Sequence, residues 1–240
     1  MEFISILANS SRSQAYLQTL VKNKIFPNKV IILDDQDKKK LGKFNNVDYT
    51  KLNKVYKFEA AQMNPRETLI ETLNKHNIKF DTVMNPDINS DELFSIISKS
   101  KIKLALVSVY AGQILREKIL TLKKYYLHIH GGILPEYRGS TTMYYSLLAS
   151  NTVGASAIFL NKGIDTGDIV CTKEYKATFG SELLDLIFDP LIRADVLINA
   201  LKKLKSNNYQ VNQQQNNVGE DYFVIHPVLK HIAILRKNQC

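Results

Sequence analysis

The first half of the chain repeats short apolar segments separated by segments whose apolar residues recur at helical spacing. Phe3–Ala8 and Lys29–Asp34 show almost no polar alternation, which is typical of strands covered on both faces of a sheet. Residues 11–22 between them carry apolar side chains at helical spacing. Strands that alternate with helices form parallel sheets with right-handed crossovers. The sequence therefore predicts an α/β, Rossmann-like fold: a mostly parallel sheet with helices on both faces, plus a short C-terminal appendage.

The remaining elements follow from the same patterns. Asn64, Pro65 and Glu67 predict a helix start, with Asn64 as the cap and Pro65 as the first helical residue. We expect a kink or break at Pro190 in the long helix near the end of the chain. The patterns predict strands over residues 82–85, 104–110, 125–130, 155–161 and 169–176, and helices from 90, over 140–149 and over 181–205. We expect one domain over 1–205 and a C-terminal extension over 206–240 that can form a dimerisation hairpin.

Composition narrows the class of protein. The 240 residues carry a formal charge of +9, and the lysines are spread along the chain. This spread favours a solvated surface over a nucleic-acid or membrane surface, although small anionic substrates would also gain from the field. No apolar run is long enough to span a bilayer, and the start predicts a strand rather than a signal peptide. Cys171 and Cys240 form no disulfide framework, which favours the cytoplasm.

Three chemically rich segments should share one rim of the sheet, because ligands of such folds bind beyond the carboxyl ends of the strands. These segments are Asn9–Ser13, Tyr110–Leu115 and His128–Arg138. His128 and His130 lie two apart on a strand, so both imidazoles face one side and can reach one substrate or one metal. The glycines and proline that follow indicate a sharp turn.

Several of these residues have a structural alternative. Arg138 can clamp a phosphate or carboxylate, or form a salt bridge that shapes its loop. Asp165, in the glycine-flanked loop 163–168, is typical of a turn residue. Residues 9–13 can form an anion site at a helix N-terminus or an ordinary serine cap. No Gly-x-Gly-x-x-Gly fingerprint is present.

The motifs resemble those of formyltransferases that use N10-formyltetrahydrofolate. The family pattern is Asn-x-His, a small-residue turn, Leu-Pro and then Arg-Gly or Pro-Gly, with a Leu-Asp-Thr-Gly-Asp-like loop downstream. The corresponding stretches here are His128–His130, Gly131–Pro135, Tyr137–Gly139 and Ile164–Asp168. Tyr110–Leu115 is similar to the family's Tyr-Gly-x-Ile-Leu stretch. The likeness covers residues 100–175 by motif and the N-terminal half by architecture.

The resemblance implies a catalytic set of His130, Asp165 and His128. His130 would take or relay the proton of the attacking amine, and Asp165 would orient His130 and pass a proton through water to the folate nitrogen. His128 replaces the family asparagine, whose amide is thought to stabilise the oxyanion; an imidazole N–H can donate the same hydrogen bond. We therefore expect a pocket that has adapted to this replacement.

The resemblance also implies binding residues, with N10-formyltetrahydrofolate as co-substrate and no metal. The folate would contact Tyr110, Gly112, Gln113, Ile114, Leu115, Gly163 and Asp168. By location, we assign the substrate to Ser10, Arg12, Arg138, Thr141 and Tyr144, with the two arginines on the diphosphate.

The acceptor is expected to be a nucleotide-linked amino sugar for bacterial surface glycans such as O-antigen or lipopolysaccharide. Residues 137–147 and the tail 223–230 look most like sugar N-formyltransferases, in which the tail often helps form a homodimer. About 35 residues follow the long helix, too few for the C-terminal barrel of tRNA formyltransferases. The alternatives are a methionyl-tRNA or glycinamide-ribonucleotide enzyme, a non-catalytic relative, a nucleic-acid binder, and a metal hydrolase that uses the His-x-His pair.

Overall fold

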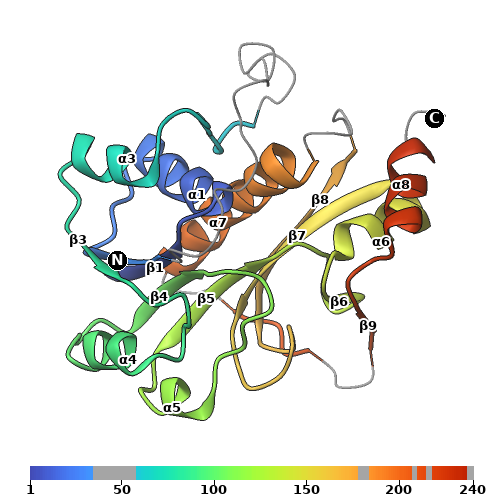
Figure 1. Ribbon diagram of the computed structural model, residues 1–240. Helices are drawn as coiled ribbons and strands as arrows, with labels where there is room; N and C mark the ends of the chain where they lie inside the picture. The colour runs from blue at the N-terminus through green and yellow to red at the C-terminus, as the bar shows by residue number, and fades with distance from the viewer. Residues whose placement is uncertain (35–57, 178–183, 207–209, 215–217, 237–240) are drawn as a thin grey trace.

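A seven-stranded sheet forms the centre of the molecule. The computed structural model describes residues 1–34, 58–177, 184–206, 210–214 and 218–236 (Figure 1). Strands follow the order β3-β2-β1-β4-β5-β7-β8; the first five are mutually parallel, and β7 runs antiparallel to both of its neighbours, β5 and β8. The predicted fold class is confirmed. The strands are β1 Phe3–Ala8, β2 Lys29–Leu33, β3 Phe80–Val83, β4 Leu104–Ser108, β5 Tyr125–His130, β7 Thr152–Phe159 and β8 Ile169–Lys176.

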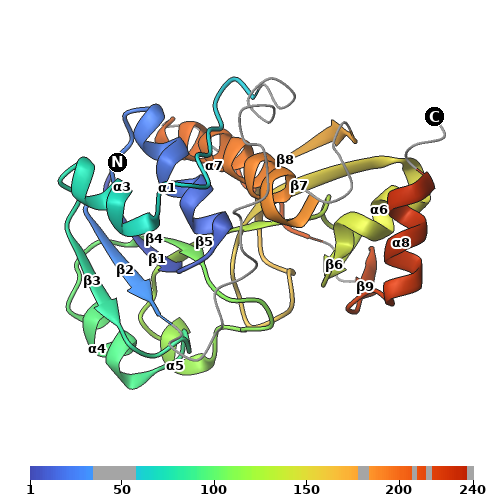
Figure 2. The ribbon, with the colours of Figure 1, turned by 45° about the horizontal axis from the view of Figure 1, so that its top comes forward.

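Helices cover both faces of the sheet (Figures 1 and 2). The helices α1 and α7 pack on one face, where Phe3 and Leu106 are buried, and α4 and α5 pack on the other, with Ile6 and Val107. All six residues of β1 are buried, as expected for a central strand without polar alternation. The helices are α1 Ser11–Lys22, α3 Leu69–Lys75, α4 Asp91–Ser98, α5 Glu117–Leu120, α6 Thr142–Ser150, the π-helix η3 Leu184–Phe188, α7 Asp189–Lys205 and α8 Pro227–Arg236.

One predicted helix start is wrong. Helix α3 begins at Leu69 rather than after Asn64, because Thr68 and Glu71 form a reciprocal capping box. Asn64 lies instead in a preceding turn, where its backbone N–H donates to Gln18 Oε1 at 2.5 Å and its carbonyl accepts from Gln18 Nε2 at 3.1 Å. The start of the predicted 181–205 helix lies outside the described residues.

The break expected at Pro190 falls one step earlier. Residues 184–188 form a π-helical turn, and Pro190 then lies in the first turn of α7. A proline costs little there, because the first N–H groups of a helix have no intrahelical partner. Pro190 therefore marks the start of the α-helix and does not interrupt it.

The C-terminal extension lies along the side of the molecule that carries α6 (Figures 1 and 2). Strand β9, Glu220–Tyr222, pairs in parallel with β6, Tyr137–Gly139, and α8 packs beside α6. Asn212 forms an antiparallel bridge with Ile169 at the start of β8. In its described part, the extension therefore pairs with the body of its own chain.

Candidate active site

The three segments predicted to share a rim do lie together. Strands β1, β4 and β5 are parallel neighbours, so their carboxyl ends meet at one edge of the sheet. In the first turn of α1, Ser13 Oγ donates to the Ser108 carbonyl at the end of β4, at 3.2 Å. Strand β5 ends at this edge with His130.

A His130–Asp165 pair forms the centre of this edge. Nδ1 of His130 lies 3.2 Å from Oδ2 of Asp165, and both side chains are largely buried. The same Oδ2 accepts from the backbone N–H of Gly139 at 2.9 Å. Asp165 adopts a left-handed backbone conformation with φ of 51°. Non-glycine residues hold such a conformation where the surrounding structure fixes it, and such residues cluster at functional sites.

The second ring nitrogen of His130 is also engaged. Nε2 lies 2.7 Å from the Tyr137 carbonyl oxygen, which can only accept, so Nε2 donates. Thr142 Oγ1 lies 3.5 Å from the same nitrogen and donates to the Gly131 carbonyl at 2.6 Å. Burial lowers the pKa of His130, and the carboxylate of Asp165 acts in the opposite direction.

His128 has a different environment. Its Nδ1 lies 3.2 Å from the Val107 carbonyl oxygen on β4, so Nδ1 is the protonated nitrogen of the neutral ring. The residue is half-buried. Burial, opposed by the carboxylate of Asp165 and reinforced by the cations Arg12 and Arg193, lowers the pKa of His128 to about 3. The imidazole is therefore neutral at physiological pH.

A buried charge cluster lies behind the histidines. Arg193 on α7 donates from Nε to Asp189 at 2.6 Å and from Nη1 to the Ile129 carbonyl at 2.9 Å. Burial and the charge of Arg193 lower the pKa of Arg12, the second residue of α1. Arg12 Nε is buried and has no hydrogen-bond partner among the described residues. The sequence interpretation missed Arg193; its i,i+4 spacing from Asp189 on a helix was the available signal.

The other predicted substrate residues are engaged within the chain. The guanidinium of Arg138 donates to Asp221 at 2.7 Å and to the carbonyls of residues 218 and 219. Thr141 Oγ1 accepts from the N–H of Ile225 at 2.8 Å, and the Tyr144 hydroxyl donates to Asp185 at 2.7 Å. Ser10 caps α1 by accepting from the Ser13 N–H. These contacts give each residue a structural role within the chain. Substrate binding by these residues stays a prediction.

Of the predicted folate residues, those in Tyr110–Leu115 follow β4 at the same edge, and Gly163 and Asp168 lie in the loop between β7 and β8. Gly112 has a φ of 83°, and a side chain at this position would meet nothing within 4 Å, while the neighbouring Ile114 is 46% exposed. Gln113 is bound to the 86–88 loop through its amide, and Tyr110 donates to the Leu33 carbonyl. Leu115 is buried, and Gly163 and Asp168 bracket the Asp165 loop.

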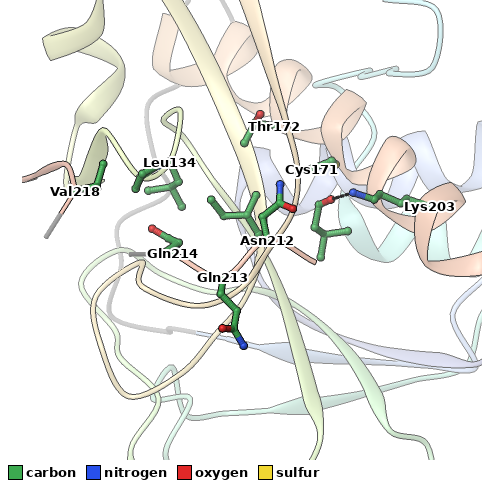
Figure 3. Close-up of a pocket in the computed structure, with 11 residues that line it drawn as sticks. Leu134, Cys171, Thr172, Lys203, Asn212, Gln213, Gln214 and Val218 are labelled. Atoms are coloured by element: carbon green, nitrogen blue, oxygen red, sulfur yellow. Dashed lines mark hydrogen bonds between the residues drawn. The ribbon is translucent and has the colours of Figure 1, made fainter. Parts of the chain in front are cut away.

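The sequence interpretation also missed Gln214, which lies in the C-terminal extension. Its Nε2 donates to the carbonyls of Asp165 at 2.9 Å and Gly167 at 2.7 Å, so the extension holds the loop that carries Asp165. Gln214 lies on the wall of a cavity of about 540 Å³ between β8, Leu134 and the extension (Figure 3). The side chains of His128, His130 and Asp165 are not among the described residues that line it.

Two further features concern metals and membranes. Across the part of the chain that the structure describes, no group of three or more His, Cys, Asp or Glu side chains is arranged to hold a metal ion. The helices described here include none that is both long and apolar enough to cross a membrane.

Comparison with known proteins settles the family. The family model described as formyl transferase matches residues 3–186. The chain belongs to the formyl transferase family. This membership confirms the resemblance that the motifs around His130 and Asp165 indicated.

Curated relatives in this family are methionyl-tRNA formyltransferases. The protein from Finegoldia magna is 30% identical over 138 residues, which cover 57% of this chain and 44% of the relative. The protein from Trichormus variabilis is 36% identical over 119 residues, covering 47% and 34%. This chain spans less than half the length of these relatives.

Solved structures share the fold of this formyl transferase chain at low sequence identity. An N-formyltransferase from Helicobacter canadensis, in complex with folinic acid and dTDP-3-aminofucose, has a TM-score of 0.60 and 17% identity, covering 93% of this chain and 71% of the other. WlaRD, a sugar 3N-formyltransferase, has a TM-score of 0.57 and 19% identity, covering 93% and 69%. Glycinamide ribonucleotide transformylase 1 from Symbiobacterium toebii has a TM-score of 0.56 and 16% identity, covering 90% and 94%.

Proposed function

We propose that this chain is an N-formyltransferase that moves a formyl group from N10-formyltetrahydrofolate to the amine of a nucleotide-linked amino sugar. The observation that carries the proposal is the His130–Asp165 pair at 3.2 Å, placed at the carboxyl end of β5 with the half-buried His128 two residues before it. A buried base, a carboxylate and neighbouring cations are the groups that acyl transfer to an amine requires.

The folate would lie along Tyr110–Leu115, with Gly163 and Asp168 beside it. The open backbone at Gly112 and the exposed Ile114 fit a flat ring that needs close approach to the main chain. When bound, this co-substrate supplies the activated formyl group. The residues of the chain would hold the acceptor amine neutral, exclude water and move its proton.

The choice of an amino sugar rests on the sequence of residues 137–147 and of the tail 223–230. Structures with this fold include an N-formyltransferase in complex with dTDP-3-aminofucose and a sugar 3N-formyltransferase, which supports the choice at the level of fold. The positive field of a chain with formal charge +9 suits a diphosphate-linked substrate. Such a product belongs to the biosynthesis of surface glycans, including O-antigen and lipopolysaccharide, in the cytoplasm.

A second candidate acceptor is methionyl-tRNA. Curated relatives at 30% and 36% identity carry that activity in their names, and the lysine-rich surface is compatible with a polyanion. A glycinamide ribonucleotide is a third acceptor, and a non-catalytic relative is the remaining alternative. Direct turnover separates all four.

The test is formyl transfer from N10-formyltetrahydrofolate to a panel of acceptors, with products read by mass spectrometry. The panel contains dTDP-, UDP- and GDP-linked amino sugars, charged methionyl-tRNA and glycinamide ribonucleotide. We expect a gain of one formyl group on one sugar. Formylation of the tRNA or of the ribonucleotide would overturn the choice of acceptor, and folate binding without any product would favour a non-catalytic relative.

The extension suggests a homodimer. Its outer side exposes several large apolar side chains, led by Phe223 at 82% and Val224 at 75%. Patches of this kind mark interaction surfaces. We propose that a second copy of the chain covers them.

A further inference from the structure

Of the two histidines at this site, only His128 has a ring nitrogen whose lone pair is open to a substrate. We propose that Nε2 of His128, and not a nitrogen of His130, is the atom that accepts the proton of the attacking amine. This inference rests on the proposed formyl transfer and names the proton acceptor within it. It reverses the roles that the family motif implies, in which the residue at position 128 donates to the oxyanion.

His130 has no nitrogen with a lone pair open to a substrate. Nε2 donates to the Tyr137 carbonyl at 2.7 Å, because that oxygen can only accept. Nδ1 faces Oδ2 of Asp165 at 3.2 Å, so any proton on this side is shared with the carboxylate. The side chain is only 6% exposed. In this arrangement neither ring nitrogen of His130 is available to accept a proton from a substrate.

His128 has the complementary arrangement. Its Nδ1 donates to the Val107 carbonyl at 3.2 Å, which leaves the lone pair of the neutral ring on Nε2. No residue in the described part of the chain forms a hydrogen bond with Nε2, and the residue is only half-buried. An amine that reaches this edge therefore meets an acceptor at His128.

Burial and the surrounding cations keep the ring of His128 neutral before attack. Arg12 from α1 and Arg193 from α7 disfavour a resting positive charge on His128, and Asp165 from the β7–β8 loop favours the charge once the proton arrives. The Val107 carbonyl on β4 holds the ring in one tautomer throughout. The base is thus neutral before attack, and a carboxylate is near it during attack.

Transfer of the formyl group exchanges one bond to its carbon for another. The amine nitrogen forms a bond to the formyl carbon, and the bond from that carbon to the folate nitrogen breaks with its electron pair moving to the folate nitrogen. The proton lost by the amine passes to Nε2 of His128 and from there to the leaving nitrogen. An asparagine at position 128 has no titratable lone pair and cannot carry this proton.

The first test is the tautomer of His128 in the full-length protein. With ¹⁵N-labelled histidine, long-range proton–nitrogen NMR separates a protonated Nδ1 from a protonated Nε2, and the His128→Asn spectrum identifies the signal. We expect a neutral ring with the proton on Nδ1 between pH 6 and pH 8. A proton on Nε2, or an imidazolium in this range, would overturn the inference.

The second test is turnover of His128→Asn, which restores the family residue and removes the base. We expect kcat to fall on the order of a hundred-fold, with KM for the acceptor little changed. The matched control is His76→Asn, at the C-terminal cap of α3, which should keep wild-type turnover. Wild-type activity in His128→Asn would overturn the role of His128 as proton acceptor and leave the proposed formyl transfer intact. An inactive wild-type chain would overturn the proposed function itself, whatever tautomer the NMR shows.

Discussion

Asp165 combines a left-handed backbone, a hydrogen bond from Gly139 and a contact with His130 in one side chain. Replacement by asparagine isolates its charge, because asparagine tolerates the same backbone conformation and still accepts from the Gly139 N–H. We expect Asp165→Asn to fold normally and to lose on the order of a hundred-fold in kcat. Steady-state kinetics and a thermal melt check both parts.

Asp81→Asn is the control for this change, because Asp81 forms an exposed ion pair with Lys29 on the far side of the sheet. Exposed pairs contribute little to stability. Near-native turnover in Asp165→Asn would remove Asp165 from the mechanism.

His128 should also make the stability of the protein depend on pH. Its pKa is about 3 in the folded state and 6.5 in a model compound, so below pH 6.5 the unfolded chain binds a proton that the folded chain does not. The free energy of unfolding therefore falls as the pH falls below 6.5, by at most about 1.4 kcal/mol per pH unit from this residue. Urea unfolding at pH 7, 6 and 5 measures this loss.

In His128→Asn this contribution is absent, so the variant should lose less stability than the wild type between pH 7 and pH 5. Parallel losses in the two proteins would mean that His128 is not held neutral by the fold. His76→Asn again provides the matched comparison.

At the scale of elements, the extension holds the loop between β7 and β8. Gln214 donates to the carbonyls of Asp165 and Gly167 and so fixes the backbone on both sides of Thr166, next to the carboxylate proposed to act with His130. We expect Gln214→Ala to lower kcat about ten-fold, since a loosened loop misplaces Asp165 relative to His130. Gln213→Ala is the control, because Gln213 is exposed and points away from Gln214 (Figure 3). Equal turnover in the two variants would contradict a positioning role for Gln214.

A variant of Arg138 can distinguish a structural role of this residue from a role in substrate binding. Its contacts with Asp221 and with residues 218 and 219 join β6 to β9, so Arg138→Gln should cost about 1–3 kcal/mol of stability. If Arg138 also clamps the diphosphate, KM for the nucleotide sugar should rise as well. Thermal unfolding and acceptor titrations measure the two effects. The exposed Arg116 at the start of α5 supplies the control Arg116→Gln, which should change neither.

Most helices and strands that are encoded by a local pattern of apolar residues could be predicted from the sequence. Strand β5 and helix α1 have the predicted bounds, because a mostly buried strand and an amphipathic helix are both encoded over consecutive residues. Strand β9 could not be predicted, since Glu220–Tyr222 is short and polar and is held by pairing with β6 eighty residues earlier.

The same limit applies to the site. Candidate catalytic residues could be named from motif resemblance. The position of the lone pair on each imidazole could not be predicted, because it depends on the Val107 and Tyr137 carbonyls supplied by tertiary structure. No spacing in the sequence indicates which carbonyl each imidazole will face. The division of roles between His128 and His130 is therefore a result of the fold.

At the scale of the whole molecule, the extension has two sides with different chemistry. Its inner side joins the body through Ile225 and Ala233, which are buried, and through Lys230, which pairs with Asp185. Its outer side exposes the apolar side chains Phe223 and Val224, and helix α8 adds Val228, Leu229, Ile232 and Leu235. Water-exposed apolar surface of this extent favours association, and a second copy of the same surface would cover it with two-fold symmetry.

We therefore expect the purified chain to have the mass of a dimer by light scattering, and the double variant Phe223→Ser with Val224→Ser to be a monomer. The variant should keep its fold, because the bonds from this segment to Thr141 use the backbone of Phe223 and Ile225 rather than the two side chains. Phe26→Ser is the control, since Phe26 is 48% exposed but lies between α1 and β2, far from the extension along the sheet. A wild-type monomer at micromolar concentration would show that this surface does not pair with itself, and a monomeric Phe26→Ser would move the interface to the opposite end of the sheet.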